Sequence, residues 1–478
     1  MSPDTVALAI LLLGIIALVG KTIRVRSKSA QRLFLPVSVI GGFLALILGP
    51  EVLGRLADLV GLPALGEGGV FGSEVLEVWS NLPDLLISVV FATLFLGKAI
   101  PSPRKAVRLM GPQLSLGVTF AAGQYVIGIL LTILLLAPLF GVPPMFGALI
   151  EMGFEGGHGT AAGMTSVMDD LGFTDGGDLA LATATVGIVS GIVIGVIAVN
   201  WAARKGHAQF LTANGGTSES TRRGVYASDE RPTGATLTVR PESLEALTLH
   251  VGIVAVAILV GQGLLSGLQA IEQALWADSV EILAYVPLFP LAMLGGVIVQ
   301  FVADKTGLAR YIDKGTLDRV QGASLDLLII SALGALSLEA IAANIGAFAI
   351  LVVVGIAWNV LVFFVLAPRF IRMYWFERGI GDFGQSMGVT ATGLLLMRMA
   401  DPENNSPAYE AFGYKQLILE PFFGGGLVTA TAIPIIAKFG PYWFLAAMIA
   451  LLVLAVVAGL YYFGRKQQFA VASSDVPS

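Results

Sequence analysis

The sequence predicts an all-α, polytopic membrane protein with about eleven transmembrane helices, arranged as two inverted five-helix repeats, each with a re-entrant hairpin, plus one extra C-terminal helix. Hydrophobic residues make up 56% of the 478 positions and charged residues only 13%, a composition unsuited to a water-soluble domain of this length. Apolar runs of about 17 to 25 residues recur, which is the length that a helix needs to cross a bilayer. The two halves also share an ordered set of short motifs.

Two apolar segments, 145–170 and 378–399, are interrupted by Gly, Ser, Thr and charged residues. Such interruptions are typical of hairpins that enter and leave the membrane on the same side. The uninterrupted runs are read as spans. The predicted spans lie at 5–22, 35–50, 79–98, 113–139, 178–201, 247–268, 283–303, 323–341, 346–368, 415–437 and 441–463.

Loop charges predict the orientation, because Lys and Arg in short loops are retained in the cytoplasm. The loops after the first and third spans are basic, so we expect the N-terminus outside, the C-terminus in the cytoplasm and the chain in the inner membrane. Acidic flanks predict that the first hairpin opens to the outside. Basic flanks predict that the second opens to the cytoplasm, and they comprise Arg369, Arg372, Arg378, Arg398 and Lys415.

A polar segment divides the chain near its middle. It is rich in Gly, Ser, Thr and Arg and lacks apolar periodicity, which predicts a flexible cytoplasmic linker. The predicted organisation is a first repeat over 1–203, a linker over 204–246, a second repeat over 247–438, and an additional helix with a cytoplasmic tail over 439–478.

Five motifs recur in the same order on both sides of this linker. Because five crossings precede the linker, the second copy begins on the opposite face of the membrane, so the repeat is inverted. The pairs are Leu35-Pro36 with Gly41-Gly42 and Phe289-Pro290 with Gly295-Gly296; Asp84 and Asp326, each followed by Leu-Leu-Ile; Ala137-Pro138 and Ala367-Pro368; 154–163 and 383–393; and Thr183-Ala-Thr185 and Thr429-Ala-Thr431.

The composition also excludes several functions. The chain has no Cys, so disulfides, thiolate metal sites and Cys nucleophiles are ruled out. Its net charge is -5 and its basic residues are scattered, so nucleic acid is not an expected partner. Inverted repeats with broken helices favour alternating access, and we expect a transporter, not an enzyme. A channel and a membrane subunit of an ion-translocating enzyme complex are the alternative classes.

The apices of the two hairpins are the candidate binding site. Gly lets the backbone approach a ligand, the N–H groups of broken helices attract carboxylates, and carbonyl, amide and hydroxyl oxygens suit Na⁺. Gly-rich helix packing and structural hydroxyls are the competing explanations. The candidates are Glu155, Gly156, Gly157, His158, Gly159 and Thr160 in the first apex and Gly384, Gln385, Ser386, Gly388, Thr390 and Thr392 in the second.

Four polar residues within predicted spans complete the candidate set. Asp84 and Asp326 lie near the starts of their predicted spans, where each carboxylate could complement a helix N-terminus or coordinate an ion. Glu420 lies inside a predicted span, so we expect it to be paired, protonated or ion-bound. Gln124 also lies mid-span, and its amide needs a partner across a helix interface.

The motifs around the two apices resemble the bacterial sodium/glutamate symporter family. The resemblance is carried by the Gly-Gly-His-Gly-Thr apex at 156–160, the Gly172-Phe173-Thr174 that follows, the Thr183-rich helix, the Pro36/Gly41-Gly42 span and the apex at 384–392. It covers most of residues 30–200 and 283–437.

This resemblance implies Na⁺ as coupling ion with no other cofactor, glutamate or a related small organic anion or amino acid as solute, and a homodimer in membrane lipid with an elevator-like movement. The matching positions are Gly156 to Thr160, Gly384, Gly388, Thr390, Thr392 and Gln124. The sequence departs from the family pattern at Ser386, where another Gly is usual, and at Glu151 and Glu155. A carboxylate there opposes an anionic solute unless it is protonated, paired or occupied by a cation.

Overall fold

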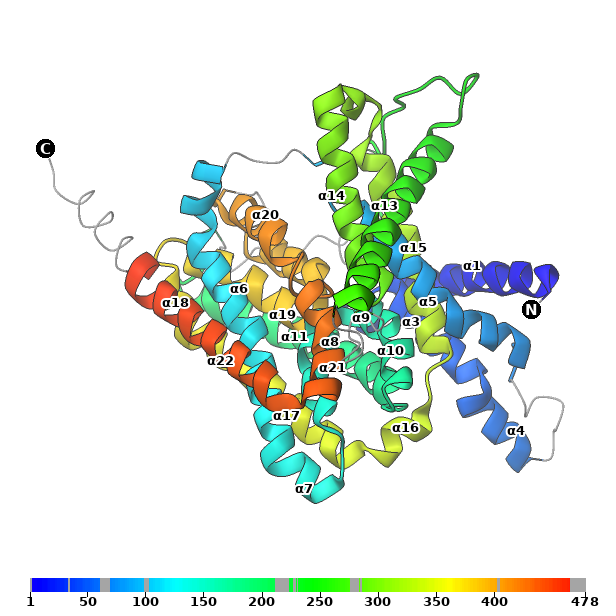
Figure 1. The fold of residues 1–478 in the computed structure, drawn as a ribbon, viewed down its shortest axis with the longest axis horizontal. Helices are drawn as coiled ribbons and strands as arrows, with labels where there is room; N and C mark the ends of the chain where they lie inside the picture. Colours follow the sequence, from blue (N-terminus) through cyan, green and yellow to red (C-terminus); the bar gives the residue numbers. More distant parts are fainter. Residues whose placement is uncertain are drawn as a thin grey trace, which may run out of the picture. The chain divides into compact units, whose positions relative to one another are not determined.

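The computed structural model describes residues 2–32, 35–60, 69–98, 103–210, 223–226, 229, 231–275, 283, 286–401 and 405–464. All regular elements in this part of the chain are helices (Figure 1). Residues 211–222, 227, 228 and 230 of the predicted linker, and 465–478 of the predicted tail, lie outside the described residues.

The described residues before the linker form eleven α-helices, and several are short segments that continue or interrupt a longer helix. They are α1 (Pro3–Arg26), α2 (Lys28–Arg32), α3 (Val37–Leu48), α4 (Arg55–Leu59), α5 (Ser73–Thr93), α6 (Pro103–Leu131), α7 (Ala137–Phe140), α8 (Leu149–Phe154), α9 (Gly157–Gly163), α10 (Thr165–Asp170) and α11 (Gly176–Lys205).

The second half has a comparable series of helices. They are α13 (Ala246–Leu275), α14 (Leu288–Thr306), α15 (Lys314–Gly334), α16 (Leu338–Ala343), α17 (Ile345–Leu361), α18 (Ala367–Phe370), α19 (Trp375–Ala400), α20 (Ala408–Leu419), α21 (Leu427–Phe439) and α22 (Pro441–Val457).

Among the described residues, nine helical stretches are long and apolar enough to cross a membrane, and each coincides with a predicted span. The other two predicted spans differ in detail. The span predicted at 323–341 is not one helix, because α15 ends at Gly334 and α16 begins at Leu338. The first two turns of α15 carry Lys314, Asp318 and Arg319, so the apolar part of this helix is short. The span predicted at 415–437 is not one helix, because residues 420–426 are non-helical and separate α20 from the short α21.

The chain forms two compact units, and each contains segments from both sides of the linker. Unit 1 comprises Met1–Ala99, His158–Val167 and Ser218–Ala340. Unit 2 comprises Ile100–Gly157, Met168–Thr217 and Ile341–Ser478. The boundary therefore passes through the first predicted hairpin, between Gly157 and His158.

Unit 1 is built from two sets of three helices that make corresponding contacts. The first set is α1, α3 and α5, and the second set is α13, α14 and α15. In the first set α1 packs on α3, and in the second α13 packs on α14. Helix α5 packs against α14 and α15, while α15 packs against α3 and α5. Each set therefore meets the other mainly through its second and third helices, while α1 also contacts α15 and α13 also contacts α5.

The Gly-Gly motif that recurs in the sequence lies at these helix contacts. A Cβ added at Gly42 would lie 2.6 Å from Leu333 of α15, and one at Gly296 would lie 2.3 Å from the Ala92 carbonyl oxygen of α5. The preceding glycine of each pair faces the preceding long helix. Its added Cβ would lie 3.2 Å from Ile16 at Gly41 and 2.0 Å from the Ala257 oxygen at Gly295. Small residues at these positions allow close helix approach.

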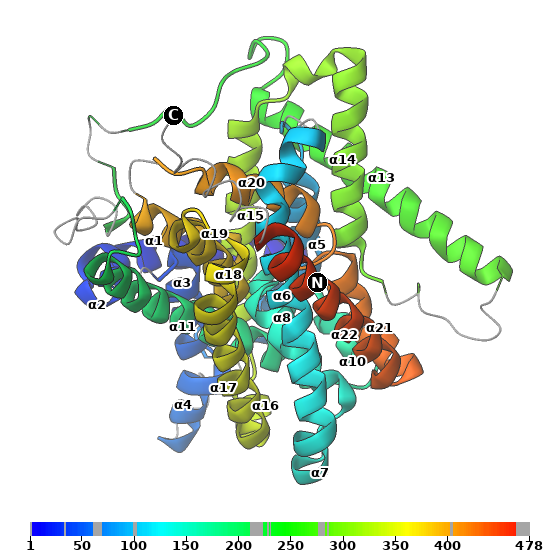
Figure 2. The ribbon, with the colours of Figure 1, turned by 90° about the vertical axis from the view of Figure 1, so that its left-hand side faces the viewer.

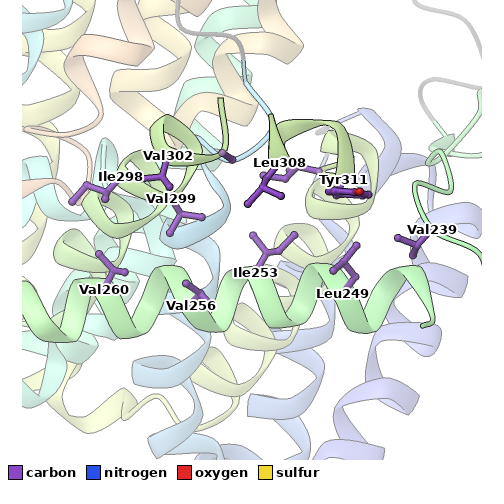
Figure 3. A pocket seen from close by; sticks show the side chains of 12 residues that line it. Val239, Leu249, Ile253, Val256, Val260, Ile298, Val299, Val302, Leu308 and Tyr311 are labelled. Carbon is purple, nitrogen blue, oxygen red and sulfur yellow. The ribbon is translucent and has the colours of Figure 1, made fainter. Parts of the chain in front are cut away.

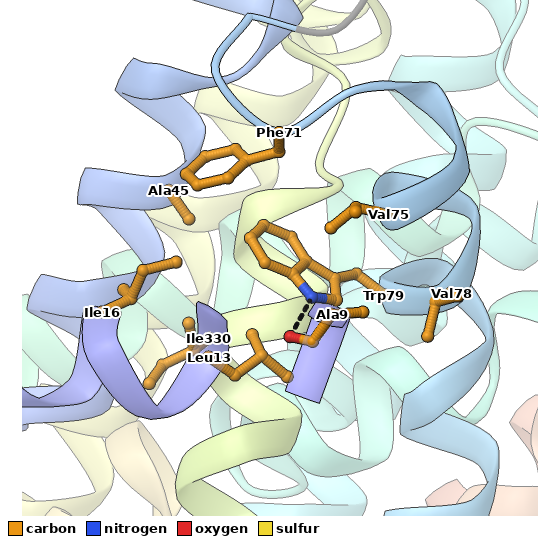
Figure 4. Close-up of a cluster of buried hydrophobic side chains, with 9 residues drawn as sticks. All are labelled: Ala9, Leu13, Ile16, Ala45, Phe71, Val75, Val78, Trp79 and Ile330. Carbon is orange, nitrogen blue, oxygen red and sulfur yellow. Dashed lines mark hydrogen bonds between the residues drawn. The ribbon is translucent and has the colours of Figure 1, made fainter. Parts of the chain in front are cut away.

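Trp79 of α5 lies at the centre of an apolar cluster in unit 1 (Figure 4). Its indole ring packs against Phe71, with 4.8 Å between the ring centroids. The indole N–H donates to the Ala9 carbonyl oxygen over 3.1 Å, which provides the partner that a buried Trp needs. This contact fixes α1 against α5.

A cavity of about 620 Å³ lies between α13 and α14 of unit 1 (Figure 3). Its lining is almost wholly apolar and includes Ile253, Val256, Ile298 and Val302, with Tyr311 at one end. A charged solute would find few hydrogen-bond donors or acceptors there, so this cavity is not suited to bind one.

Unit 2 contains α6, α8, α11 and α17 to α22. The two long helices α6 and α17 end in the same way, because a π-helical turn (Thr132–Leu136 or Val362–Leu366) leads into a four-residue helix (α7 or α18) that begins with the repeated Ala-Pro motif. The additional helix α22 lies along α6 (Figures 1 and 2). The Phe444 ring of α22 packs edge-on against Tyr125 of α6 at a centroid distance of 5.1 Å.

Candidate functional site

The first predicted hairpin is interrupted at its apex. Helix α8 ends at Phe154, and α9 begins at Gly157 after two residues that belong to neither helix. The backbone N–H groups of Glu155 and Gly156 both donate to the Glu151 carbonyl oxygen over 3.0 Å. Gly157 has φ +69°, a conformation that glycine adopts without steric cost.

The second predicted hairpin contains an interruption within α19. Gly388 and Val389 have non-helical backbone angles, so the helix has two halves. Val389 has φ +59°, which is rare for a β-branched residue. Strained backbone of this kind often marks a functional segment.

These two interruptions contact each other within unit 2. A Cβ added at Gly157 would lie only 2.3 Å from Cγ1 of Val389. Helix α11 also reaches the second interruption, because a Cβ at Gly187 would lie 2.4 Å from the Met387 carbonyl oxygen. The absence of side chains at these glycines lets three segments converge at one place.

Two amides support the backbone just before the second interruption. The Ser386 carbonyl oxygen accepts from Nε2 of Gln124 at 2.8 Å and from Nδ2 of Asn359 at 3.2 Å. Gln124 also donates to Oδ1 of Asn359 over 3.0 Å. Carbonyls at a helix end lack partners within the helix, so this amide pair from α6 and α17 satisfies one of them. Gln124 therefore has the partner across a helix interface that the sequence required.

Glu151 connects three segments of unit 2. Its carboxylate accepts from the Tyr125 hydroxyl at 2.5 Å, from the Gly424 N–H at 2.9 Å and from the Thr429 hydroxyl at 2.9 Å. All three donors are neutral. The carboxylate thus ties α6, the 420–426 segment and α21 to α8, which gives Glu151 a structural role.

A chain of buried polar groups leads from α20 to the first interruption. Lys415 is fully buried, and its ammonium donates to Oδ1 of Asp382 at 2.8 Å and to Oε1 of Gln385. The amide nitrogen of Gln385 faces Oε1 of Glu155 at 3.5 Å. Oε2 of Glu155 has no hydrogen-bond partner although this residue is only 2% exposed.

Glu420 is held at the C-terminal end of α20, not in the middle of a spanning helix. Its Oε1 accepts from the Thr390 hydroxyl at 2.8 Å and from Nε2 of Gln416 at 2.8 Å. Gln416 also donates to the Thr390 hydroxyl at 2.7 Å. The expectation that this carboxylate needs partners is met by neutral donors.

Other candidate residues at the two interruptions are divided between the units. Gly384 and Gly393 approach closely, because a Cβ at Gly384 would lie 2.8 Å from the Gly393 Cα. Thr392 faces Gly388, and its Oγ1 lies 2.7 Å from a Cβ added there. The candidates from unit 2 are Glu155, Gly156, Gly157, Gly384, Gln385, Ser386, Gly388, Thr390, Thr392, Glu420 and Gln124.

His158, Gly159, Thr160, Asp84 and Asp326 belong to unit 1. His158 and Thr160 are buried, and a Cβ at Gly159 would lie 2.9 Å from the Ile87 side chain. Asp84 and Asp326 are exposed in unit 1 and lie in the middle of α5 and α15. Neither therefore complements the N-terminus of its own helix. Instead, the Asp84 side chain reaches Ser166 in the first turn of α10, and the Asp326 side chain reaches Ser38 in the first turn of α3.

Several polar residues of unit 2 were not among the sequence-derived candidates. Asn359 could have been found as a polar residue inside an apolar run, and Tyr125 follows the candidate Gln124 directly. Asp382 and Lys415 are not among the candidates because the sequence places Lys415 with the basic residues of a predicted loop. Lys415 is fully buried and Arg378 is only 3% exposed, so neither can be counted in a rule that applies to loops.

A helical membrane protein whose broken helices converge on buried polar groups is typical of secondary transporters. Comparison with known proteins agrees, because residues 3–398 match the family described as sodium/glutamate symporter. The chain therefore belongs to the sodium/glutamate symporter family, and it is a membrane transporter and not an enzyme.

Two curated relatives are similar over most of their length. The sodium/glutamate symporter of Escherichia coli (strain K12) is 27% identical over 340 residues, which cover 70% of this chain and 77% of the relative. The sodium/glutamate symporter of Shigella flexneri matches with the same identity and coverage.

Proposed function

We propose that this chain takes up glutamate or a related small carboxylate across the inner membrane by symport with Na⁺. The observation that carries the proposal is the contact between Gly157 and Val389, which joins two interrupted segments inside a membrane protein. Membership of the sodium/glutamate symporter family supports the solute and the ion.

The proposed binding region consists of the two interruptions and the polar groups around them. Peptide N–H groups at the start of a helix segment, as after Val389, favour a carboxylate, and free carbonyls favour Na⁺. Asp84 and Asp326 of unit 1 are proposed to contribute to ion or solute binding. We propose the same role for Glu155, Gly156, Gly157, His158, Gly159, Thr160, Gly384, Gln385, Ser386, Gly388, Thr390, Thr392, Glu420 and Gln124.

Alternating access by an elevator-like movement is the proposed mechanism. Inverted repeats are supported by the two units, because each unit takes helices from both sides of the linker. The matching glycine contacts of α3 and α14 and the matching π-helical turns also support them. We further propose a homodimer, with the N-terminus outside and the C-terminus in the cytoplasm. The burial of Arg378 and Lys415 leaves the basic loops after the first and third spans to support that orientation.

Uptake into proteoliposomes tests the proposal. Purified protein should accumulate labelled glutamate only when an inward Na⁺ gradient is present, and replacing Na⁺ by K⁺ or choline should reduce uptake to that of empty liposomes. Uptake that ignores Na⁺ contradicts the coupling, and single-channel currents contradict alternating access.

Coupling to H⁺, or transport of a different small organic solute, is the second candidate. The buried chain from Lys415 through Gln385 to Glu155 favours it, because ionisable groups inside a membrane often mark proton pathways. Glutamate uptake that follows an inward pH gradient in the absence of Na⁺ would select this alternative.

A further inference from the structure

We infer that Glu155 binds the ammonium group of the transported solute, so that the protein prefers amino acids over carboxylates that lack an amine. This inference rests on the proposed function and names the chemical class of its solute. It concerns a carboxylate at a position where the sequence departs from the family pattern.

Glu155 is a buried carboxylate whose hydrogen bonds are incomplete. Its side chain is 2% exposed, and Oε2 has no hydrogen-bond partner. Oε1 has a single contact, to the Gln385 amide nitrogen at 3.5 Å, which is long for a hydrogen bond. A buried carboxylate in this condition is unfavourable unless a further donor or cation reaches it.

Lys415 interacts with Glu155 electrostatically, but within the described part of the chain no charged side chain donates a hydrogen bond to the Glu155 carboxylate. Glu155 interacts electrostatically with Glu151 of α8, Asp382 of α19, Lys415 of α20 and Glu420, which follows α20. Lys415 is the one cation of the four, and its ammonium donates to Asp382 and Gln385. The surroundings of Glu155 are therefore negative overall, which attracts a cationic group and repels an anionic one.

Glycines next to Glu155 bring neighbouring segments close to it. Gly156 and Gly157 follow it and have no side chains, and Gly424 lies against it, since a Cβ there would be 3.5 Å from Cγ of Glu155. Gly157 in turn contacts Val389 at the second interruption. A solute held at the two interruptions would thus lie next to the open oxygen of Glu155.

An ammonium group suits this position better than a metal ion does. Metal ions such as Ca²⁺ and Mg²⁺ take about six oxygen ligands, whereas an ammonium has only three donors to satisfy. Within the described part of the chain, no three or more His, Cys, Asp and Glu side chains are grouped as a metal site. The α-ammonium of an amino acid would provide Oε2 with a charge-assisted hydrogen bond.

A comparison of glutamate with glutarate tests the inference, because glutarate has both carboxylates and lacks the amine. Each compound competes with labelled glutamate for Na⁺-driven uptake by the wild type, Glu155→Gln and Glu151→Gln. The wild type should prefer glutamate by about 10- to 100-fold, the value expected for one charged hydrogen bond. Glu155→Gln should reduce this preference to about threefold or less.

Glu151→Gln is the matched control. Glu151 lies four residues earlier and accepts three hydrogen bonds from the protein, so its replacement should lower total uptake and leave the preference unchanged. If a variant does not transport, thermal-shift titration of the purified protein with glutamate and glutarate in Na⁺ buffer gives the same ratio from binding.

Three results separate the possible failures. An unchanged preference in Glu155→Gln overturns the inference, whether or not its Na⁺ dependence shifts. Equal binding of glutamate and glutarate by the wild type also overturns the inference and leaves the proposed transport function intact. A wild type that neither transports nor binds glutamate overturns the proposed function itself.

Discussion

Gly157 and Val389 touch across the two helix interruptions of unit 2, and the contact leaves no space for a side chain at position 157. A Cβ there would lie 2.3 Å from Cγ1 of Val389, well inside van der Waals contact. Gly388, the residue before Val389, is also confined, since its Cβ would lie 2.7 Å from Oγ1 of Thr392. These distances connect the geometry of the interruptions to transport.

We predict that Gly157→Leu and Gly388→Leu abolish transport. Leucine at either position would push the interruptions apart and displace the backbone that is proposed to contact the solute. At position 157 it would also have to adopt φ +69°. Uptake in proteoliposomes should fall to background, while the amount of protein inserted in the membrane stays close to that of the wild type.

Gly141→Leu is the control for backbone strain alone. Gly141 also has a positive φ, +71°, but a Cβ at that position would have nothing within 4 Å. This variant should keep most of its uptake. Normal transport by both Gly157→Leu and Gly388→Leu would show that the two interruptions are not part of the transport pathway.

The buried ion pair between Lys415 and Asp382 leads to a second prediction. Lys415→Met should destabilise the protein by about 3 to 5 kcal/mol, because it leaves the Asp382 carboxylate buried without its cation. The double variant Lys415→Met/Asp382→Asn should recover part of that loss. Thermal unfolding in detergent, followed by intrinsic fluorescence, measures both effects.

Lys438→Met provides the comparison for loss of a lysine in the same region. Lys438 is exposed in the last turn of α21, so its replacement should change stability by no more than about 0.5 kcal/mol. Equal stability of Lys415→Met and Lys438→Met would mean that the ion pair does not contribute to folding.

Much of the fold could be predicted because hydrophobic length and interruption are local properties of a sequence. The nine long apolar helices found among the described residues, and the two interruptions at Glu155–Gly156 and Gly388–Val389, all fall where composition predicts them. The division into two interleaved units could not be predicted, because it depends on which helices pack together. The break between α20 and α21 was missed because apolar residues on both sides of it gave the whole of 415–437 the hydropathy of a span, although Pro421 and the glycines at 424–426 are typical of a break.

The partners of the candidate residues were harder to predict than the candidates. Glu155 and Gln385 were found because they lie in the apices themselves. Lys415 was misread as a loop charge, because nothing local shows that Asp382 lies 2.8 Å from its ammonium. Asn359 was overlooked although it is a polar residue in an apolar run, and only the folded chain brings it to the Ser386 carbonyl.

The amide pair at that carbonyl gives a third prediction. Gln124→Leu or Asn359→Leu removes one of two donors to Ser386 O and should destabilise the protein by about 1 to 2 kcal/mol, the range found for hydrogen bonds between membrane helices. Because both amides hold the backbone next to Gly388, we also expect lower uptake. The two effects should be less than additive in the double variant, since the amides share one acceptor and bond each other.

Asn200→Leu serves as the reference for this pair. Asn200 is an exposed amide that bonds only the Val196 carbonyl four residues earlier in α11. Its replacement should leave both stability and uptake close to wild type. Strict additivity of Gln124→Leu and Asn359→Leu would mean that the two amides do not act as one support.

A fourth prediction concerns Asp313, which precedes α15 and holds part of the linker outside the spanning helices. Burial alone would raise the pKa of this carboxyl, but the N–H groups of Thr316 and Thr236 and the Thr316 hydroxyl donate to it, and His250 lies nearby, so the pKa is lowered. Because the pKa is lower in the folded protein, the ionised carboxyl stabilises the fold at pH values above the pKa of about 3.9 in the unfolded chain. This stabilisation is lost as the pH falls through the lower pKa of the folded protein.

Hydrogen exchange at Thr236 measures this loss, because its N–H donates to Oδ2 of Asp313 over 3.2 Å. After correction for intrinsic exchange rates, protection of the Thr236 amide should persist from neutral pH down to the ordinary Asp value of about 3.9, and it should disappear only at lower pH, where the folded carboxyl becomes protonated. Asp313→Asn should lose much of that protection at neutral pH, since a neutral amide is a weaker acceptor. Asp318→Asn, one helical turn into α15, should leave the protection unchanged, and equal protection in all three proteins would mean that Asp313 does not hold the linker.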